Sequence, residues 1–328
     1  MHGDARGPLQ CGHHRRGRLG WSGRRPAARA GACVSRSGPA HADSTGQLVL
    51  DFAWLDTLWL QVTGTVCNIA CLHCFISCGP KNTRHDLLSV EQCRQALDEA
   101  AARGVRHVWF TGGEPFLHPD MLTILDLALD RAAVGVLTNG MLIDDALAAA
   151  LAERFRSAPY NLEIRVSLDG ATAAENDKVR GRGVFEQTCA GVRRLAEHGL
   201  EPILAVTTLD DSAPVQQRFA DLLRDLGVSK PRVKWIPPFR IGREARRGRE
   251  YEAWERLATA DLADPSVALK LQCGTSRTVT SQGVFACPIL IDEPGAKLGD
   301  ALGDTLDGNP VDHPACHTCW VEGFSCSA

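Results

Sequence analysis

Alternating strand-forming and helix-forming segments between residues 55 and 240 constrain the fold of this chain most strongly. Six segments rich in apolar and β-branched residues predict strands, at 58–62, 107–110, 135–137, 162–167, 202–207 and 232–236. Strands joined through helices pair in parallel with right-handed crossovers. We therefore expect an α/β fold, and the pattern fits a partial (β/α)6 barrel better than a flat open sheet.

Polar motifs follow four of these predicted strands. They are a cysteine-rich loop after the first strand, Gly112-Gly113-Glu114-Pro115 after the second, Thr138-Asn139 after the third and Ser167-Leu168-Asp169 after the fourth. The carboxyl ends of parallel strands meet at one edge of a sheet, where binding and catalytic groups gather. The sequence therefore predicts that these motifs face one common mouth.

The cysteine-rich loop carries Cys67, Cys71 and Cys74 within eight residues. Three thiolates hold three irons of a [4Fe-4S] cubane and leave the fourth iron open to a ligand. A structural zinc site is the alternative, with His73 or Cys78 as the fourth ligand. The strand-end position and the later motifs favour the cluster.

The cysteine triple after the first strand, together with Gly112-Gly113-Glu114-Pro115 after the second, resembles the radical S-adenosylmethionine (SAM) superfamily. The resemblance covers about residues 55–240, the expected core domain. It implies that the open iron chelates the amino and carboxylate groups of SAM. Electron transfer from a donor such as flavodoxin or ferredoxin then yields a 5′-deoxyadenosyl radical, which abstracts a substrate hydrogen.

The same resemblance implies a set of SAM-binding residues. Gly112, Gly113, Glu114 and Pro115 match the segment that contacts the methionine amine, where glycines allow close backbone approach. The other implied pocket residues are Thr138 and Asn139 as lining, and Ser167 and Asp169 as partners of the SAM ribose or carboxylate.

Two residues of the expected pocket carry alternatives. Arg180 either pairs with the SAM carboxylate or orders its own loop. His73 stands where the family often has an aromatic residue; its imidazole is able to stack on adenine, but the departure weakens the role.

Cysteines return in residues 241–328, where helical periodicity weakens. A cysteine pair on a hairpin-like segment followed by a Cys-x-x-Cys motif resembles the twitch or SPASM extension of radical SAM enzymes, which implies a C-terminal domain with one auxiliary [4Fe-4S] cluster. We choose Cys273, Cys287, Cys316 and Cys319 as its ligands, with Cys326 as a substitute ligand or free thiol. A zinc knuckle is the alternative.

Cys78 lies near the expected mouth. A thiol there is a candidate hydrogen-atom donor to a substrate radical, as radical SAM epimerases require. Cys326 is a second candidate for this catalytic role.

Composition limits the remaining possibilities. Thirteen cysteines without a signal peptide or an apolar run long enough to span a bilayer indicate metal chemistry in the cytoplasm. Residues 1–45 hold eight Arg and two Asp, and we expect a disordered arm or sequence upstream of the natural start. The rest carries a net charge of −9, which argues against nucleic acid as a partner.

The substrate is the least constrained part of the prediction. Residues 1–54 are too short and polar for a leader-peptide-binding domain, which favours a carbohydrate-like natural product, such as an aminoglycoside-type intermediate, that is epimerised or dehydrogenated. The alternative substrate is a ribosomal precursor peptide. A third hypothesis is a non-catalytic iron–sulfur or zinc protein on the same scaffold, against which the intact cysteine triple argues.

Overall fold

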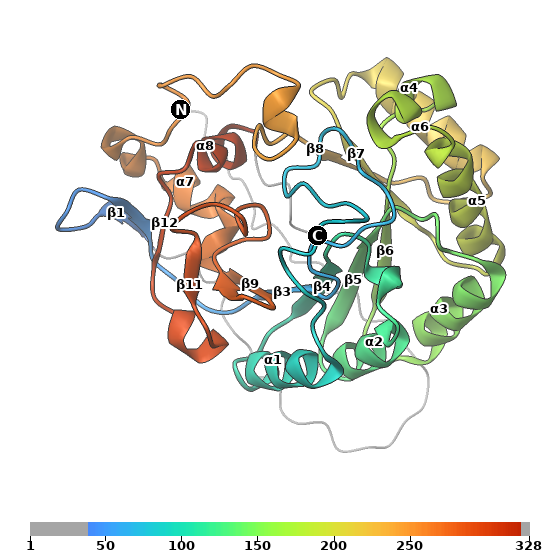
Figure 1. Ribbon diagram of the computed structural model, residues 1–328, viewed down its shortest axis with the longest axis horizontal. Helices are drawn as coiled ribbons and strands as arrows, with labels where there is room; N and C mark the ends of the chain where they lie inside the picture. The colour runs from blue at the N-terminus through green and yellow to red at the C-terminus, as the bar shows by residue number, and fades with distance from the viewer. Residues whose placement is uncertain (1–38, 323–328) are drawn as a thin grey trace, which may run out of the picture. The chain divides into compact units, whose positions relative to one another are not determined.

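Six parallel strands form the centre of the computed structural model, which describes residues 39–322. They lie side by side in chain order: β3 (Thr57–Gln61), β4 (His107–Thr111), β5 (Ala133–Thr138), β6 (Leu162–Ser167), β7 (Ile203–Thr207) and β8 (Val233–Ile236). Every neighbouring pair in this series is parallel, with Trp59 opposite Trp109 in the first pair. The expected α/β fold with six parallel strands is confirmed (Figure 1).

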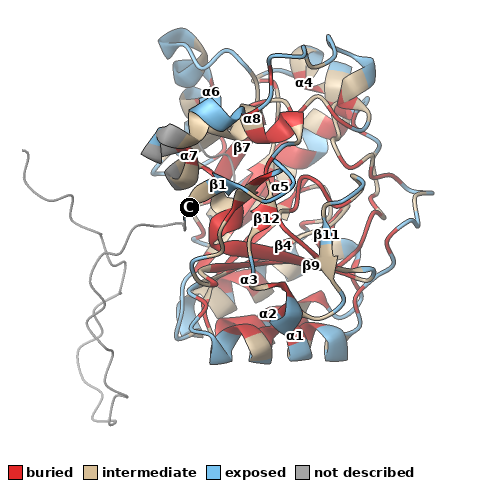
Figure 2. Cartoon of the chain, turned by 90° about the vertical axis from the view of Figure 1, so that its left-hand side faces the viewer, coloured by how far each residue is buried: buried red, intermediate tan, exposed pale blue. Residues whose placement is uncertain are grey.

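Helices follow the strands and cover the outer face of the sheet (Figure 1). They are α1 (Val90–Ala102), α2 (Met121–Leu129), α3 (Asp145–Ser157), α4 (Ala173–Arg180), α5 (Val184–Glu197) and α6 (Ala213–Asp225). Ser89 caps α1 by accepting from the backbone of Gln92, whose side chain accepts in return from the Ser89 backbone. In Figure 2 the outer surfaces of α1 and α2 are exposed, whereas the strands above them are buried.

One prediction about this part of the chain is wrong. The sequence placed Arg180 in a loop, but it is the last residue of α4. Thr172 caps that helix at its start, and Gly181, with a φ of 115°, ends it.

Residues after β8 extend the same sheet. The antiparallel strands β9 (Ser276–Thr280), β10 (Gly283–Phe285) and β11 (Lys297–Gly299) add to its edge, and β9 pairs in parallel with β3. Helices α7 (Pro265–Lys270) and α8 (Pro314–Val321) pack against each other in the same C-terminal segment (Figure 1). Short 3-10 helices complete the described elements: η1 (Pro115–Leu117), η2 (Glu244–Arg246), η3 (Thr259–Ala263), η4 (Gln272–Gly274) and η5 (Leu302–Thr305).

A separate three-stranded antiparallel sheet joins the two ends of the described chain. It contains β1 (Ala40–Ala42), β2 (Leu48–Leu50) and β12 (Asn309–Pro310), with β2 in the middle. Strand β1 falls within residues 1–45, which the sequence interpretation expected to be a disordered arm; residues 1–38 of that segment lie outside the described residues.

Two main apolar clusters stabilise this arrangement. The larger fills the space between the sheet and helices α1, α2, α3, α5 and α6, with Leu60, Phe110 and Val136 fully buried. The second lies under the C-terminal elements and contains Leu50, Phe239 and Val311. Within residues 39–322, no helix combines the length and apolar character needed to cross a bilayer.

Candidate active site and metal centres

The loop after β3 gathers the three cysteines of the predicted cluster at the carboxyl end of the sheet. Cys67 and Cys71 are buried and Cys74 is half-buried. The Cys74 backbone N–H donates to the Cys71 carbonyl at 3.3 Å, and the Leu72 N–H donates to the Val179 carbonyl of α4 at 2.8 Å. The loop is therefore held both by its own turns and by a neighbouring helix.

Burial controls the ionisation of these thiols. It raises the pKa of Cys67 to about 12 and also raises the pKa of Cys71. A hydrogen bond from the Cys78 thiol, helped by the Cys78 backbone N–H at 3.3 Å, lowers the pKa of Cys74 to about 6. Two of the three thiols therefore stay protonated at neutral pH until a metal replaces the proton.

The Gly112-Gly113-Glu114 segment packs directly on the cysteine loop. Gly112 has a φ of 143°, and a Cβ on Gly113 would lie 1.9 Å from the Val66 carbonyl oxygen. The Glu114 N–H donates to that same carbonyl at 3.1 Å. Only glycine allows this close approach beside Cys67.

The carboxylate of Glu114 is completely buried and connects two strand ends. It accepts hydrogen bonds from the Thr138 hydroxyl and the Asn139 backbone N–H, both at 2.7 Å, and from the Phe116 N–H at 3.2 Å. Burial outweighs these bonds and raises its pKa to about 7. Asn139 in turn donates to the Asn68 side chain at 2.7 Å. Glu114, Thr138 and Asn139 thus form one network with the cysteine loop, and Pro115 is buried at the start of η1.

A buried ion pair lies at the end of β6. Arg180 and His73 place Nε and Nε2 atoms 2.7 and 3.0 Å from Asp169 Oδ2, and the Thr207 N–H donates to Oδ1. Although burial alone would raise the pKa of Asp169, the Arg180 charge and His73 hold it well below its usual range. The predicted residues His73, Asp169 and Arg180 therefore meet, while Ser167 stands half-buried at the end of β6.

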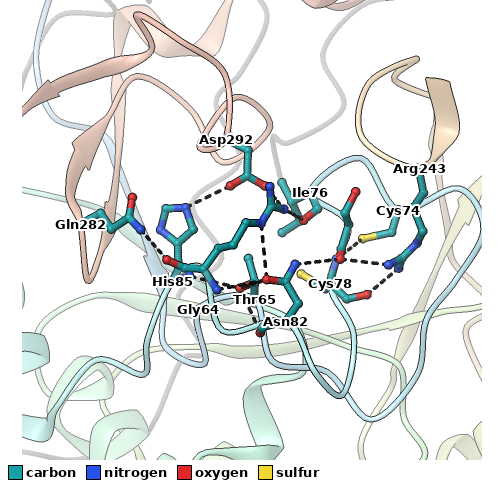
Figure 3. A network of polar contacts seen from close by, with 12 residues as sticks. Gly64, Thr65, Cys74, Ile76, Cys78, Asn82, His85, Arg243, Gln282 and Asp292 are labelled. Carbon is teal, nitrogen blue, oxygen red and sulfur yellow. Dashed lines mark hydrogen bonds and ion pairs between the residues drawn. The ribbon is translucent and has the colours of Figure 1, made fainter. Parts of the chain in front are cut away.

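Arg243 is a site residue that the sequence interpretation missed. Its guanidinium donates to the carbonyls of Cys71 at 2.7 Å and Ser77 at 2.9 Å and also to that of Cys78, and its backbone N–H donates to the Cys74 carbonyl at 3.0 Å. Figure 3 shows this side chain beside Cys74 and Cys78. Its only sequence signal is its position directly after a glycine beyond the last parallel strand.

The C-terminal segment also holds the cysteine loop from the opposite side. Asp292 accepts from Arg84 at 2.6 Å and lies 3.2 Å from Nε2 of buried His85. Gln282, in the turn between β9 and β10, donates to the Arg84 carbonyl (Figure 3). The cysteine loop is therefore fixed on both sides by residues after β8.

The candidate hydrogen donors differ in what the structure describes. Cys78 is 4% exposed and its thiol lies 3.8 Å from the Gly112 carbonyl oxygen. The hydrogen bond to Cys74, followed by burial, raises its pKa. Cys326 lies outside the described residues.

Four cysteines of the C-terminal segment line one cavity. Cys273 belongs to η4, Cys287 follows β10, and Cys316 and Cys319 are one turn apart on α8. Apolar side chains complete the walls, among them Leu271, Ile289 and Leu290. Burial raises the pKa of both Cys273 and Cys316.

These are the four ligands that the sequence suggested for an auxiliary cluster. In the described part of the chain, no three His, Cys, Asp or Glu side chains converge closely enough to share one metal ion. The ligands of a [4Fe-4S] cubane lie farther apart than the ligands of a single metal ion, because each thiolate binds a different iron.

Arg277 on β9 stands beside this cavity and was also missed. It is completely buried, and burial lowers its pKa to about 10, against the effect of negative charge at Cys273 and Cys287. Arginine is rarely fully buried, so an arginine within a predicted strand is a sequence signal that could have drawn attention to Arg277.

The donor sets fit the groups that the sequence predicts. Three thiols on one loop suit a cluster with one open iron. Nδ1 of His73 is buried and has no hydrogen-bond partner in the described part of the chain, so a polar group of a bound ligand would satisfy it. The residues present therefore fit a three-thiolate cluster with SAM beside it.

Comparison with known proteins identifies the family. Residues 62–211 match the family model described as the radical SAM superfamily. Mycofactocin maturase MftC of Mycolicibacterium smegmatis is 32% identical over 265 residues, which cover 73% of this chain and 65% of the relative. The antilisterial bacteriocin subtilosin biosynthesis protein AlbA of Bacillus subtilis is 31% identical over 180 residues, 54% of this chain and 39% of the relative. The chain belongs to the radical SAM superfamily.

Solved structures agree on the fold. Streptococcus suis SuiB bound to S-adenosylmethionine superposes with a TM-score of 0.60 at 15% identity, covering 83% of this chain and 69% of that one. A structure of anSMEcpe with bound AdoMet gives a TM-score of 0.54 at 14% identity, covering 74% of each chain. The matched regions of the two curated relatives above span 39% and 65% of their own lengths.

Proposed function

We propose that this radical SAM enzyme modifies a peptide substrate and carries an auxiliary iron–sulfur cluster beside its SAM-binding cluster. The observation that supports a peptide is the pair of relatives named as a bacteriocin biosynthesis protein and a mycofactocin maturase. These relatives favour the peptide hypothesis over the carbohydrate-like substrate that the sequence alone suggested. That expectation depended on residues 1–54 being too short and polar for a leader-peptide-binding domain.

In this proposal Cys67, Cys71 and Cys74 hold the first cluster. With such a cluster and SAM bound, the site would supply the one-electron reductive cleavage of SAM that allows a hydrogen atom to be abstracted from a substrate carbon. The protein's own task is to place and shield that chemistry. Glu114 ties the ends of β4 and β5 to the cysteine loop, which keeps the pocket wall rigid.

The His73, Asp169 and Arg180 group orders the other side of the proposed pocket. Asp169 fixes Nε2 of His73, which leaves the buried Nδ1 of that ring available to a ligand. The Arg180 guanidinium is paired with Asp169. We therefore propose that Arg180 holds Asp169 in place at the pocket wall. Any contact of Arg180 with the SAM carboxylate would be made while this ion pair is kept. Ser167 is proposed as a further contact to SAM from the end of β6.

The auxiliary cluster is proposed on Cys273, Cys287, Cys316 and Cys319 because their thiols line a single apolar cavity. An electron acceptor near the substrate would favour oxidation over epimerisation. We also propose a reducing compartment such as the cytoplasm, where free thiols persist before cluster insertion, and a flavodoxin or ferredoxin as electron donor.

The test has two stages. Anaerobically reconstituted protein is mixed with SAM and dithionite, and 5′-deoxyadenosine is measured against the variant Cys67→Ala/Cys71→Ala/Cys74→Ala. We expect the product from the wild type alone; equal amounts from both proteins would refute SAM cleavage at this site. Each short peptide encoded beside the gene is then co-expressed with the enzyme and analysed by mass spectrometry.

The peptide analysis separates the reaction types. A loss of hydrogen mass that requires the intact cysteine triple indicates oxidation, and an altered residue configuration without a mass change indicates epimerisation. Unmodified peptides, combined with SAM cleavage stimulated by an aminoglycoside, would contradict the peptide proposal and support the carbohydrate-like one.

A further inference from the structure

Arg277 is a cation placed entirely inside the C-terminal segment. Its side chain is 0% exposed, and its guanidinium lies 3.9 Å above the ring of Phe52. Arginines with no exposed surface are rare unless an anion accompanies them, because moving a charge out of water is costly.

The hydrogen-bond acceptors around Arg277 are all neutral. Nε donates to the Thr305 carbonyl at 2.6 Å, Nη1 to the Cys273 carbonyl at 2.7 Å and Nη2 to the Asp307 carbonyl at 2.7 Å. Nη1 also reaches the Ser276 carbonyl and, at 3.4 Å, the side-chain oxygen of Asn309. These bonds satisfy the donors but leave the positive charge unbalanced.

No carboxylate compensates this charge directly. Among the side chains of residues 39–322 that the structure describes, none of Asp or Glu lies within ion-pair distance of the Arg277 guanidinium. The ionisable groups that act on it most strongly are the thiols of Cys273 and Cys287, followed by Asp307. Both of those thiols line the cavity of the proposed auxiliary cluster.

The arrangement suits an anionic occupant of the cavity. A [4Fe-4S] cluster with four thiolate ligands is negatively charged in both oxidation states and becomes more negative on reduction. A buried cation therefore interacts more favourably with the reduced cluster than with the oxidised one.

We propose that Arg277 is the fixed counter-cation of the auxiliary cluster and raises its reduction potential. This inference rests on the proposed function, in which Cys273, Cys287, Cys316 and Cys319 hold that cluster. Arg277 acts as a positioning and charge-compensating residue, because it donates to the carbonyl of the proposed ligand Cys273 and brings a positive charge beside the cavity.

The test uses full-length protein with Cys67→Ala/Cys71→Ala/Cys74→Ala as background, so that a signal from the auxiliary cluster is observed alone. Arg277→Gln removes the charge and Arg277→Lys retains it. The midpoint potential is measured by redox titration followed by electron paramagnetic resonance. We expect Arg277→Gln to shift the oxidised-to-reduced ratio at least tenfold toward oxidised, which corresponds to about 59 mV for one electron. Arg277→Lys should shift it less than about threefold, or about 28 mV by the same conversion.

Several outcomes overturn the proposal. An iron-loaded Arg277→Gln protein with the potential of the background would refute the charge effect while leaving the auxiliary cluster in place. A lysine variant that folds but shifts as far as the glutamine variant would show that only the geometry of the guanidinium matters. If the background itself binds no iron and sulfide, the auxiliary-cluster proposal fails and this inference fails with it.

A second substitution tests the idea if the glutamine variant does not fold. Asn309 is completely buried beside Nη1 of Arg277, and Asn309→Asp adds a carboxylate without changing the volume. With both proteins free of cluster, Asn309→Asp should have a higher Tm than the background protein that retains Asn309. The new carboxylate would pair with Arg277, and a buried ion pair is more favourable than a lone buried cation. A fall in Tm, as expected for an uncompensated buried carboxylate, would overturn the proposal.

Discussion

Replacing Arg243 with glutamine tests whether this residue holds the cysteine loop in its metal-binding shape. The substitution removes the guanidinium donors to the carbonyls of Cys71, Ser77 and Cys78. At about 1 kcal/mol net for each hydrogen bond, the loop loses about 3 kcal/mol of local stability, or about a hundredfold in its order–disorder equilibrium. We therefore expect faster backbone exchange in residues 62–88 and poor loading of the first cluster.

The assay combines iron analysis with hydrogen–deuterium exchange after anaerobic reconstitution. Arg246→Gln is the matched control, because Arg246 is exposed and lies three residues away. We expect Arg243→Gln to retain the auxiliary iron and lose most of the iron bound by the loop, whereas Arg246→Gln behaves like the wild type. Full iron content with unchanged exchange in Arg243→Gln would refute the bracing role.

Three further predictions follow from individual contacts. Burial raises the pKa of Glu114 from 4.5 to about 7, so the protonated carboxyl favours the folded state. This stabilisation is fully present below pH 4.5 and is lost as the pH rises through 7. The metal-free wild type should therefore lose ~3 kcal/mol of unfolding free energy across this window. Denaturant titrations should show no such loss for Glu114→Gln, and parallel pH profiles of the two proteins would contradict the assignment. Gly113→Ala should abolish loading of the first cluster, because the new Cβ collides with the Val66 carbonyl. The control is Gly79→Ala on the cysteine loop, whose Cβ would make only ordinary contacts at 3.6 Å and which should load iron normally. Equal iron content in the two variants would be evidence against the packing argument. If Cys78 donates a hydrogen atom to the substrate radical, Cys78→Ala should cleave SAM but stop epimerised product, and unchanged product formation would eliminate that role.

Local patterns carried most of the fold prediction. The parallel strands were predictable because each apolar segment is followed by a helix with its own start signal, as at Ser89 and Asp144. The sequence also predicted that the motifs at Gly113 and Asp169 lie at the same edge of the sheet, because parallel strands all end on one side. Helix α4 was missed because it is only eight residues long and mostly polar, so its sequence shows little amphipathic periodicity.

Long-range contacts explain what the sequence did not predict. Strand β2 pairs with residues 309–310, more than 250 positions away, and strands this short have no detectable alternation. Arg243 and Arg277 act through backbone carbonyls of distant segments, and a carbonyl acceptor exists at every residue, so no residue type marks the partner. Such residues become recognisable only when the packed structure brings the segments together.

Iron and sulfide analysis of three proteins tests the central claim most directly. Wild type, Cys67→Ala/Cys71→Ala/Cys74→Ala and Cys273→Ala/Cys287→Ala/Cys316→Ala/Cys319→Ala are reconstituted anaerobically in parallel. Two [4Fe-4S] clusters predict about eight irons in the wild type and about four in each variant. About four irons in the wild type, none in the first variant and four in the second would contradict the auxiliary cluster and leave a radical SAM enzyme with a single cluster.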